Sequence, residues 1–289
     1  MLEIGLPVAF VLLLWWASTG AILYLNGLPR RTHAWSLGSA TVLLVLALLA
    51  LVVTRDDTRA TGAYLAFIAA LVVWGWAELA FLLGRVTGPR REACPPHAGG
   101  WRRAWLGLQT VLYHEIALIV LGAAVLMAVG DGPNRSGVWT FAALWVLRLS
   151  AKLNLLLGVR NVGEAFLPPQ LAYLASYFRQ RAMNPLLPLS LALSAGATAA
   201  VWQAALAGAT AAHDAAALAL LGSLVALGLL EHVFLALPLP THRLWQWSLR
   251  SRPAAPATSE ANRRDTIAPN PEPSAQKDSR TQHLSALSP

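Results

Sequence analysis

The sequence predicts an all-α, polytopic membrane protein, a bundle of about seven transmembrane helices with a disordered C-terminal tail. Of its 289 residues, 56% are hydrophobic and only 12% are charged, whereas a soluble domain is roughly 25% charged. The hydrophobic residues form long runs without the two-residue alternation that is typical of a barrel strand. Because every backbone polar group in lipid needs a partner within the protein, these runs favour helices.

Seven apolar runs follow one another along the chain. We expect them to span the membrane at residues 4–26, 34–53, 61–84, 105–129, 137–158, 187–208 and 215–237. Each is about long enough to cross a hydrocarbon core of roughly 30 Å as a helix. The first run lacks a basic leading segment and a small-residue cleavage site, so we expect a retained helix and not a removed signal peptide. The sixth run is rich in Ala, Gly, Ser and Leu, which favours close helix packing.

Two of the connections are long. Residues 85–104 are rich in Pro, Gly and Arg, which predicts an irregular loop. Within residues 159–186, apolar side chains recur at helical spacing, at Leu171, Leu174, Tyr177 and Phe178. This pattern predicts a short amphipathic helix that lies either on the membrane surface or against the bundle.

The composition changes after Arg250 to Pro, Ser, Thr and Ala without an apolar period. We therefore expect a transmembrane domain at residues 1–250 and a disordered cytoplasmic tail at residues 251–289.

The net charge of +8 is unevenly distributed along the chain. If the N-terminus lies outside the cytoplasm, most of the Lys and Arg residues fall in cytoplasmic segments, and the outer loops keep Arg55, Arg59 and Arg135. This asymmetry is that of the positive-inside rule, and it predicts a periplasmic N-terminus and a cytoplasmic C-terminus. Topology and contact with anionic lipid then account for the basic charge, so we expect the lipid bilayer and no nucleic acid as a partner.

Ionisable residues lie inside four of the seven runs. They are Glu78, His114, Glu115, Arg148, Lys152, Glu231 and His232. A charge at membrane depth is costly, so such residues usually face a partner, a cavity or a ligand. Because consecutive spans alternate in direction, most of these residues share a depth of roughly 9–15 Å below the cytoplasmic boundary. The sequence therefore predicts one polar layer shared by four helices.

The layer has two main interpretations. Arg148 and Lys152 are four residues apart and share a helix face, so they need anions, and the layer can be a buried ion-pair network. Alternatively, it binds a tetrapyrrole. One buried imidazole, of His114 or His232, then ligates the central metal, and Arg or Lys binds the carboxylates.

Two further interpretations stay open. The adjacent His and Glu residues at 114–115 and 231–232, together with Glu78, could act as metal ligands. Their spacing lacks the pattern of helical metal sites, however, and we assign no metal site. The fourth interpretation is a proton or ion pathway through the layer. His213-Asp214 is expected in a solvated outer loop, and no catalytic residue is assigned.

Several uncommon strings occur in one order along the chain. They are Trp74-Gly75-Trp76 with Glu78, Phe81-Leu82 and Gly84; Thr87-Gly88-Pro89-Arg90; Cys94-Pro95-Pro96; Tyr113-His114-Glu115; Ser150-Ala151-Lys152-Leu153-Asn154; Leu157-Gly158-Val159-Arg160-Asn161; Phe166-Leu167-Pro168-Pro169; and Leu230-Glu231-His232 with Phe234-Leu235 and Pro238-Leu239-Pro240. In these strings the chain resembles the PuhE-type photosynthetic complex assembly proteins of purple bacteria, over roughly residues 5–250.

The resemblance implies an integral protein of the bacterial inner (intracytoplasmic) membrane that is encoded among photosynthesis genes. It also implies a link to assembly of the reaction centre and light-harvesting complex and to bacteriochlorophyll supply. Our leading hypothesis is a non-enzymatic assembly factor. The expected partners are subunits of these complexes or enzymes of pigment synthesis. The alternatives are a metal-dependent membrane enzyme of pigment or lipid metabolism and a proton-coupled transporter. The resemblance supplies no catalytic residues.

Overall fold

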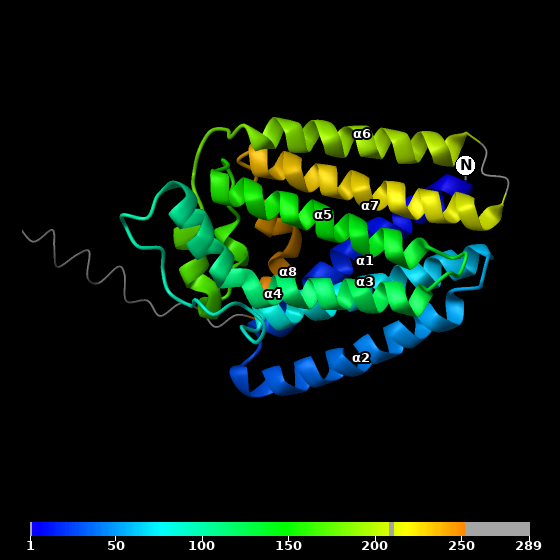
Figure 1. Cartoon of the computed structure of the whole chain (residues 1–289), viewed down its shortest axis with the longest axis horizontal. Helices are drawn as coiled ribbons and strands as arrows, with labels where there is room; N and C mark the ends of the chain where they lie inside the picture. Colours follow the sequence, from blue (N-terminus) through cyan, green and yellow to red (C-terminus); the bar gives the residue numbers. More distant parts are fainter. Residues whose placement is uncertain (1, 208–210, 252–289) are drawn as a thin grey trace, which may run out of the picture. The chain divides into compact units, whose positions relative to one another are not determined.

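A computed structural model describes residues 2–207 and 211–251 (Figure 1). The long helices are α1 (Leu2–Gly27), α2 (His33–Thr54), α3 (Ala60–Leu82), α4 (Gly100–Val129), α5 (Ser136–Leu157), α6 (Leu186–Leu206) and α7 (Ala212–Ala236). Short elements are η1 (Arg30–Thr32), η2 (Glu164–Phe166), η3 (Pro169–Tyr177), η4 (Thr241–Trp245) and α8 (Gln246–Leu249). All seven long helices are long and apolar enough to cross a membrane, which confirms the predicted fold class.

The expected tail at residues 251–289 lies, apart from Ser251, outside the described residues. The division of the chain into a transmembrane domain and a tail therefore stays a prediction.

Helix α3 lies at the centre of the bundle, where it contacts α1, α2, α4, α5 and α7 (Figure 1). Many of its buried side chains are small, among them Ala63, Ala66, Ala70 and Ala77. Small side chains let neighbouring helices approach closely, which is how helices associate in lipid. The central position of α3 explains why its one carboxylate, Glu78, is buried.

Two apolar clusters fix the rotation of the helices around α3. Leu51, Val73, Leu118 and Phe141 join α2, α3, α4 and α5. The Phe141 ring packs edge-on against Trp74, with ring centroids 5.6 Å apart. On the other side of α3, a second cluster joins it to α1 and α7. Together these contacts turn the polar faces of α3, α4 and α5 toward one another.

The predicted amphipathic helix is the 3₁₀ helix η3, and it packs against the bundle. Leu171 and Leu174 are buried in a cluster with Phe81 of α3. The buried Tyr177 accepts a hydrogen bond from Arg90 Nε (2.7 Å) and donates one to the Glu92 carbonyl (3.1 Å). Of the two expected placements, the structure therefore shows packing on protein. The same contacts hold the α3–α4 connection in place.

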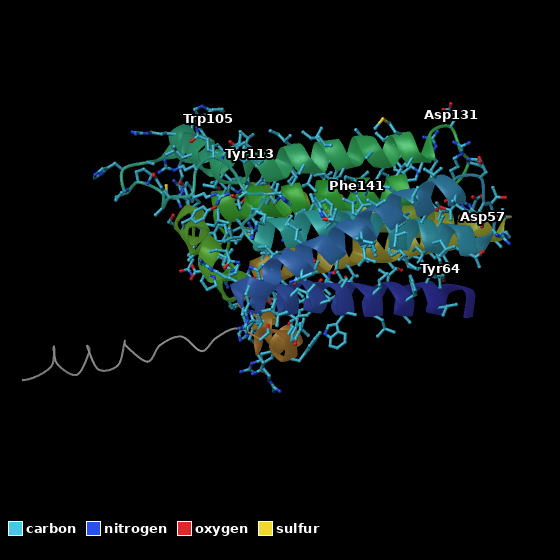
Figure 2. All side chains as sticks on the ribbon, turned by 90° about the horizontal axis from the view of Figure 1, so that it is seen from below. Asp57, Tyr64, Trp105, Tyr113, Asp131 and Phe141 are labelled. Atoms are coloured by element: carbon cyan, nitrogen blue, oxygen red, sulfur yellow. The ribbon has the colours of Figure 1, made fainter. Side chains whose placement is uncertain are left out.

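The two ends of the bundle differ in charge. Asp57 and Asp131 lie at one end, and Trp105 lies at the other (Figure 2). At the Trp105 end, the connections and the first turn of α4 carry Arg30, Arg31, Arg85, Arg90, Arg91, Arg102, Arg103, Arg160, Arg179 and Arg181. We call this the basic end. Its charge follows the positive-inside pattern, although its cytoplasmic location stays a prediction.

We expect Gly88→Ala to destabilise the α3–α4 connection by about 2 kcal/mol, the usual scale of overpacking. A Cβ atom at Gly88 would overlap the backbone of Gln109 and Thr110 in α4, which cannot move aside as a flexible side chain can. Thermal unfolding in detergent checks this result. Gly99→Ala is the matched control, because a Cβ atom there meets nothing within 4 Å. Equal unfolding midpoints for the two variants would contradict the prediction.

Candidate functional site

Five of the predicted site residues lie together where α3, α4 and α5 meet. They are Glu78, His114, Glu115, Arg148 and Lys152, and we call them the ion-pair cluster. Arg148 Nη2 donates to Glu78 Oε2 at 3.3 Å. Lys152 Nζ donates to Glu115 Oε1 at 2.6 Å. The two cations of α5 thus pair separately, one with α3 and the other with α4.

His114 lies next to Glu78 of the Arg148–Glu78 pair and is fully buried. Its ring packs on Phe81, with centroids 4.7 Å apart. Its Nε2 is 4.0 Å from Glu78 Oε1, which is too far for a hydrogen bond. Neither ring nitrogen has a hydrogen-bond partner, and Glu78 Oε1 has none either. The imidazole is therefore desolvated, and both of its nitrogens are uncommitted.

Arg148 gives the ion-pair cluster an open side. Its side chain is 46% exposed, whereas that of its partner Glu78 is 10% exposed. Val146 and Leu149 are also exposed and share the outward face of α5, and Arg148 lies at the edge of that face, about 100° around the helix from Leu149. In a membrane helix such a face meets hydrocarbon, a ligand or another protein and not water. An arginine there carries a cost unless something polar covers it.

His232 belongs to a different group of residues. Its Nδ1 lies 2.7 Å from the Gly228 carbonyl, and its Nε2 lies 2.9 Å from Ser150 Oγ. Because a carbonyl only accepts, Nδ1 carries the proton and Nε2 accepts from the Ser150 hydroxyl. Ser150 Oγ is also 3.0 Å from Ser190 Oγ. Both ring nitrogens of His232 are therefore in use.

Asn154 and Asn184 complete this hydrogen-bonded network. Asn154 Nδ2 donates to Ser190 Oγ at 2.9 Å, and Asn184 Nδ2 donates to Asn154 Oδ1 at 3.1 Å. Both asparagines are almost fully buried. We define the network as Ser150, Asn154, Asn184, Ser190 and His232. It links α5, α6 and α7, so it lies on a different interface from the ion-pair cluster.

Glu231, the last predicted site residue, faces α1. Its Oε1 accepts a hydrogen bond from Trp15 Nε1 at 3.1 Å. The predicted layer is thus divided among three helix interfaces, and the two adjacent His and Glu pairs do not converge on one centre. Among residues 2–207 and 211–251, no three His, Cys, Asp or Glu side chains gather in a way that could hold a metal ion.

Sequence reasoning missed the four uncharged members of the network. Two signals could have found them. Ser150 and Asn154 are four residues apart, so they share a face of α5. Asn184 precedes a proline and an apolar run, which is a typical helix start.

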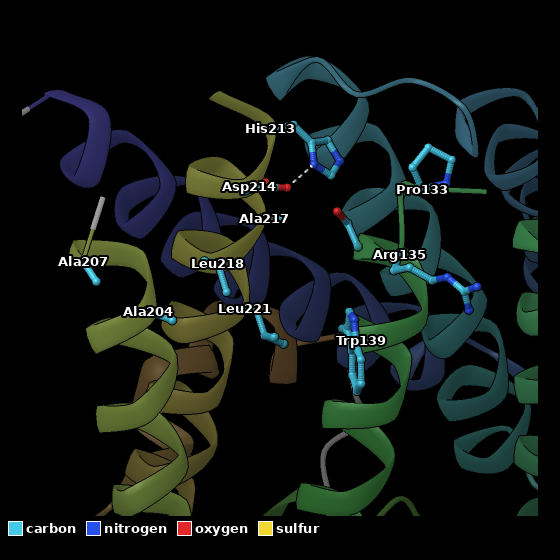
Figure 3. Close-up of a pocket in the computed structure, with 11 residues that line it drawn as sticks. Pro133, Arg135, Trp139, Ala204, Ala207, His213, Asp214, Ala217, Leu218 and Leu221 are labelled. Atoms are coloured by element: carbon cyan, nitrogen blue, oxygen red, sulfur yellow. Dashed lines mark hydrogen bonds and ion pairs between the residues drawn. The ribbon is translucent and has the colours of Figure 1, made fainter. Parts of the chain in front are cut away.

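A pocket of about 570 Å³ lies far from the ion-pair cluster, at the N-terminal end of α5 (Figure 3). Arg135 and Trp139 line one side of it, and His213 and Asp214 line the other. His213 was expected in a solvated loop, but it is buried in the first turn of α7, with Nδ1 3.1 Å from Asp214 Oδ1. The expectation was wrong because α7 begins at Ala212, before its apolar run.

The fold and the paired charges define the class of this protein, a multi-pass helical membrane protein with ionised residues between its spans. The chain belongs to the DUF3623 family, described as "protein of unknown function", whose model matches residues 1–256. It is similar to a protein of Rhodobacter capsulatus described as "uncharacterized 30.4 kDa protein in puhA 5'region". The two are 44% identical over 243 residues, which cover 82% of this chain and 88% of that protein. No solved structure matches the chain.

Proposed function

We propose that this protein is an integral-membrane assembly factor for the bacterial photosynthetic reaction centre and light-harvesting complex. In this proposal it holds or delivers bacteriochlorophyll or a precursor within the membrane. The support is the similarity to the Rhodobacter capsulatus protein of the puhA 5' region, together with the resemblance to PuhE-type assembly proteins. Its location would be the inner (intracytoplasmic) membrane, with the basic end in the cytoplasm.

The observation that carries a binding role is the open side of the ion-pair cluster. Arg148 has five N–H donors, and its side chain makes one hydrogen bond among the described residues, to Glu78. The side chain is 46% exposed within a predicted membrane span, so its remaining donors are accessible there. A carbonyl or carboxylate oxygen of a pigment, or a polar group of a partner helix, would cover them and remove the cost of their exposure.

The donor set of the ion-pair cluster fits a tetrapyrrole. Imidazole nitrogen is a common axial ligand, and His114 offers two ring nitrogens without hydrogen bonds. His232 is the weaker candidate, because ligating a metal would break its bond to Ser150 or to Gly228. In this assignment Glu78 holds Arg148 in place. Lys152 and Glu115 tie α5 to α4, and Glu231 lies outside the site.

The test is an absorption spectrum, with metal analysis, of the full chain purified in mild detergent from a photosynthetic host. We expect pigment in near-stoichiometric amount. His114→Phe should lower the pigment content because it removes both nitrogens but keeps an aromatic ring against Phe81. Arg148→Gln should lower it because the charge is lost. Arg135→Gln, at the other end of α5, is the matched control.

The mature photosynthetic complex, measured by its near-infrared absorption in cells, is the second readout. We expect it to fall in the His114 and Arg148 variants and to stay normal in the Arg135 variant. A colourless, metal-free protein with normal complex levels in both variants would refute the proposal. Bound iron or zinc without pigment would favour a membrane enzyme instead.

A further inference from the structure

A second pocket, of about 260 Å³, lies at the basic end. Three segments that are distant in sequence enclose it. Arg30 comes from the α1–α2 turn, Arg85, Thr87 and Arg91 from the chain after α3, and Tyr173 from η3. The pocket therefore forms only when the chain folds, and it cannot be predicted from any single stretch of the sequence.

The arginines that line this pocket give it a positive charge. Arg30, Arg85 and Arg91 line it, and no carboxylate does. Among the described residues none of these three arginines makes an ion pair. Other exposed arginines do, since Arg55 and Arg59 each pair with a neighbouring aspartate. Three unpaired guanidinium groups around one hollow favour an anion.

The pocket also contains two buried hydroxyls that lie beside each other. Thr87 is 1% exposed, and its hydroxyl is next to that of Tyr173. Apart from this contact, neither hydroxyl has a hydrogen-bond partner. Burial raises the pKa of Tyr173, and the nearby Thr87 and Arg91 oppose that shift only in part. The phenol therefore stays protonated and can donate. Two neighbouring hydroxyls satisfy at most one of their two O–H donors with each other. The remaining buried donor costs free energy, which an oxyanion would recover.

The position of the pocket relative to the membrane indicates the source of this anion. Arg30 lies between the first two apolar helices, and Arg85 follows α3 by three residues. Both side chains are therefore at a membrane boundary, where lipid head groups lie. A guanidinium fork matches the oxygens of a phosphate group, with which it forms bidentate hydrogen bonds.

We infer that this pocket binds the phosphate of an anionic membrane lipid, held by Arg30, Arg85 and Arg91 at the rim and by the Thr87 and Tyr173 hydroxyls inside. A free phosphate compound has the same binding chemistry, so the experiment separates the two sources. This inference does not depend on the proposed role in pigment handling.

The experiment is native mass spectrometry of the full chain in detergent, titrated separately with phosphatidylglycerol, phosphatidylcholine and inorganic phosphate. The pocket variant is Arg30→Gln with Arg85→Gln and Arg91→Gln. Its control, Arg31→Gln with Arg102→Gln and Arg160→Gln, removes the same charge from exposed arginines that do not line the pocket. We expect phosphatidylglycerol affinity to fall at least about tenfold in the pocket variant and less than about twofold in the control.

Thr87→Val is the second variant. It removes a hydroxyl whose one polar neighbour is the Tyr173 hydroxyl in the same pocket, so the fold should persist while phosphatidylglycerol affinity falls about threefold. Equal losses in the pocket and control variants would overturn the inference, as would equal affinity for phosphatidylcholine. Inorganic phosphate that binds as tightly as phosphatidylglycerol, and is lost in the pocket variant, would overturn the lipid as the source.

Discussion

Replacing Arg148 by Met should lower the free energy of unfolding by about 3 kcal/mol, because it leaves the Glu78 carboxylate buried without its counter-ion. Glu78 Oε2 would lose its hydrogen bond at 3.3 Å, and Oε1 already has none. The exposed part of Arg148 lies along a membrane span, so water does not screen the pair as it would at a soluble surface. Unfolding in mixed micelles, followed by circular dichroism, measures the loss.

Two further variants separate this effect from the loss of a charge in general. Glu78→Met combined with Arg148→Met should recover most of the stability, because a buried ion pair can be replaced by apolar side chains at little cost. Arg160→Met, an exposed arginine beyond the end of α5, should unfold like the wild type. A single Arg148→Met variant as stable as the wild type would show that the pair does not form in the membrane.

The second large effect is expected for Asn184→Ala, at about 3 kcal/mol. Asn184 Oδ1 accepts from the backbone N–H groups of Leu186 and Leu187 at the start of α6. Its Nδ2 donates to the Gly158 carbonyl at 2.7 Å, just after α5. Losing a cap costs roughly 0.5–2 kcal/mol, and leaving buried carbonyls unsatisfied costs about 1–3 kcal/mol more.

The matched control for this variant is Asn161→Ala, which removes a single exposed hydrogen bond to the Leu239 carbonyl. Asn184→Asp should have an intermediate stability. It keeps an oxygen that accepts from the Leu186 and Leu187 N–H groups, but it loses the N–H donors of Nδ2. We expect unfolding midpoints in the order wild type, Asn161→Ala, Asn184→Asp, Asn184→Ala. An Asn184→Ala midpoint no lower than that of Asn161→Ala would contradict the assigned role.

The sequence predicts the membrane helices well where the loops are short. The expected spans at 34–53 and 137–158 differ from α2 (His33–Thr54) and α5 (Ser136–Leu157) by one residue at each end. The agreement arises because the apolar run and the helix end at the same place. It fails for α4, which begins at Gly100 and not at 105. Hydropathy reports where a helix enters lipid, whereas backbone hydrogen bonding continues beyond that point.

The candidate site is predictable in its ionisable members but not in their pairing. Glu78, Arg148 and Lys152 are conspicuous because charges are rare inside apolar runs. Which carboxylate meets which cation depends on the rotation of each helix, and packing around Trp74 and Phe141 sets that rotation. Serine lowers the hydropathy of a span only slightly, asparagine carries no charge, and Asn184 lies outside the apolar runs. A search for ionisable residues inside those runs therefore could not find the network around His232.

The length of α4 has a consequence for what the protein presents to its surroundings. Its 30 residues make a rod of about 45 Å, whereas the hydrocarbon of a bilayer is roughly 30 Å thick. Its first turns therefore extend past the hydrocarbon, and there Arg103 donates to the carbonyls of Ser176, in η3, and Phe178, just after it. The first turns of α4 and η3 therefore form one protein surface at the level of the lipid head groups, where the basic pocket also lies.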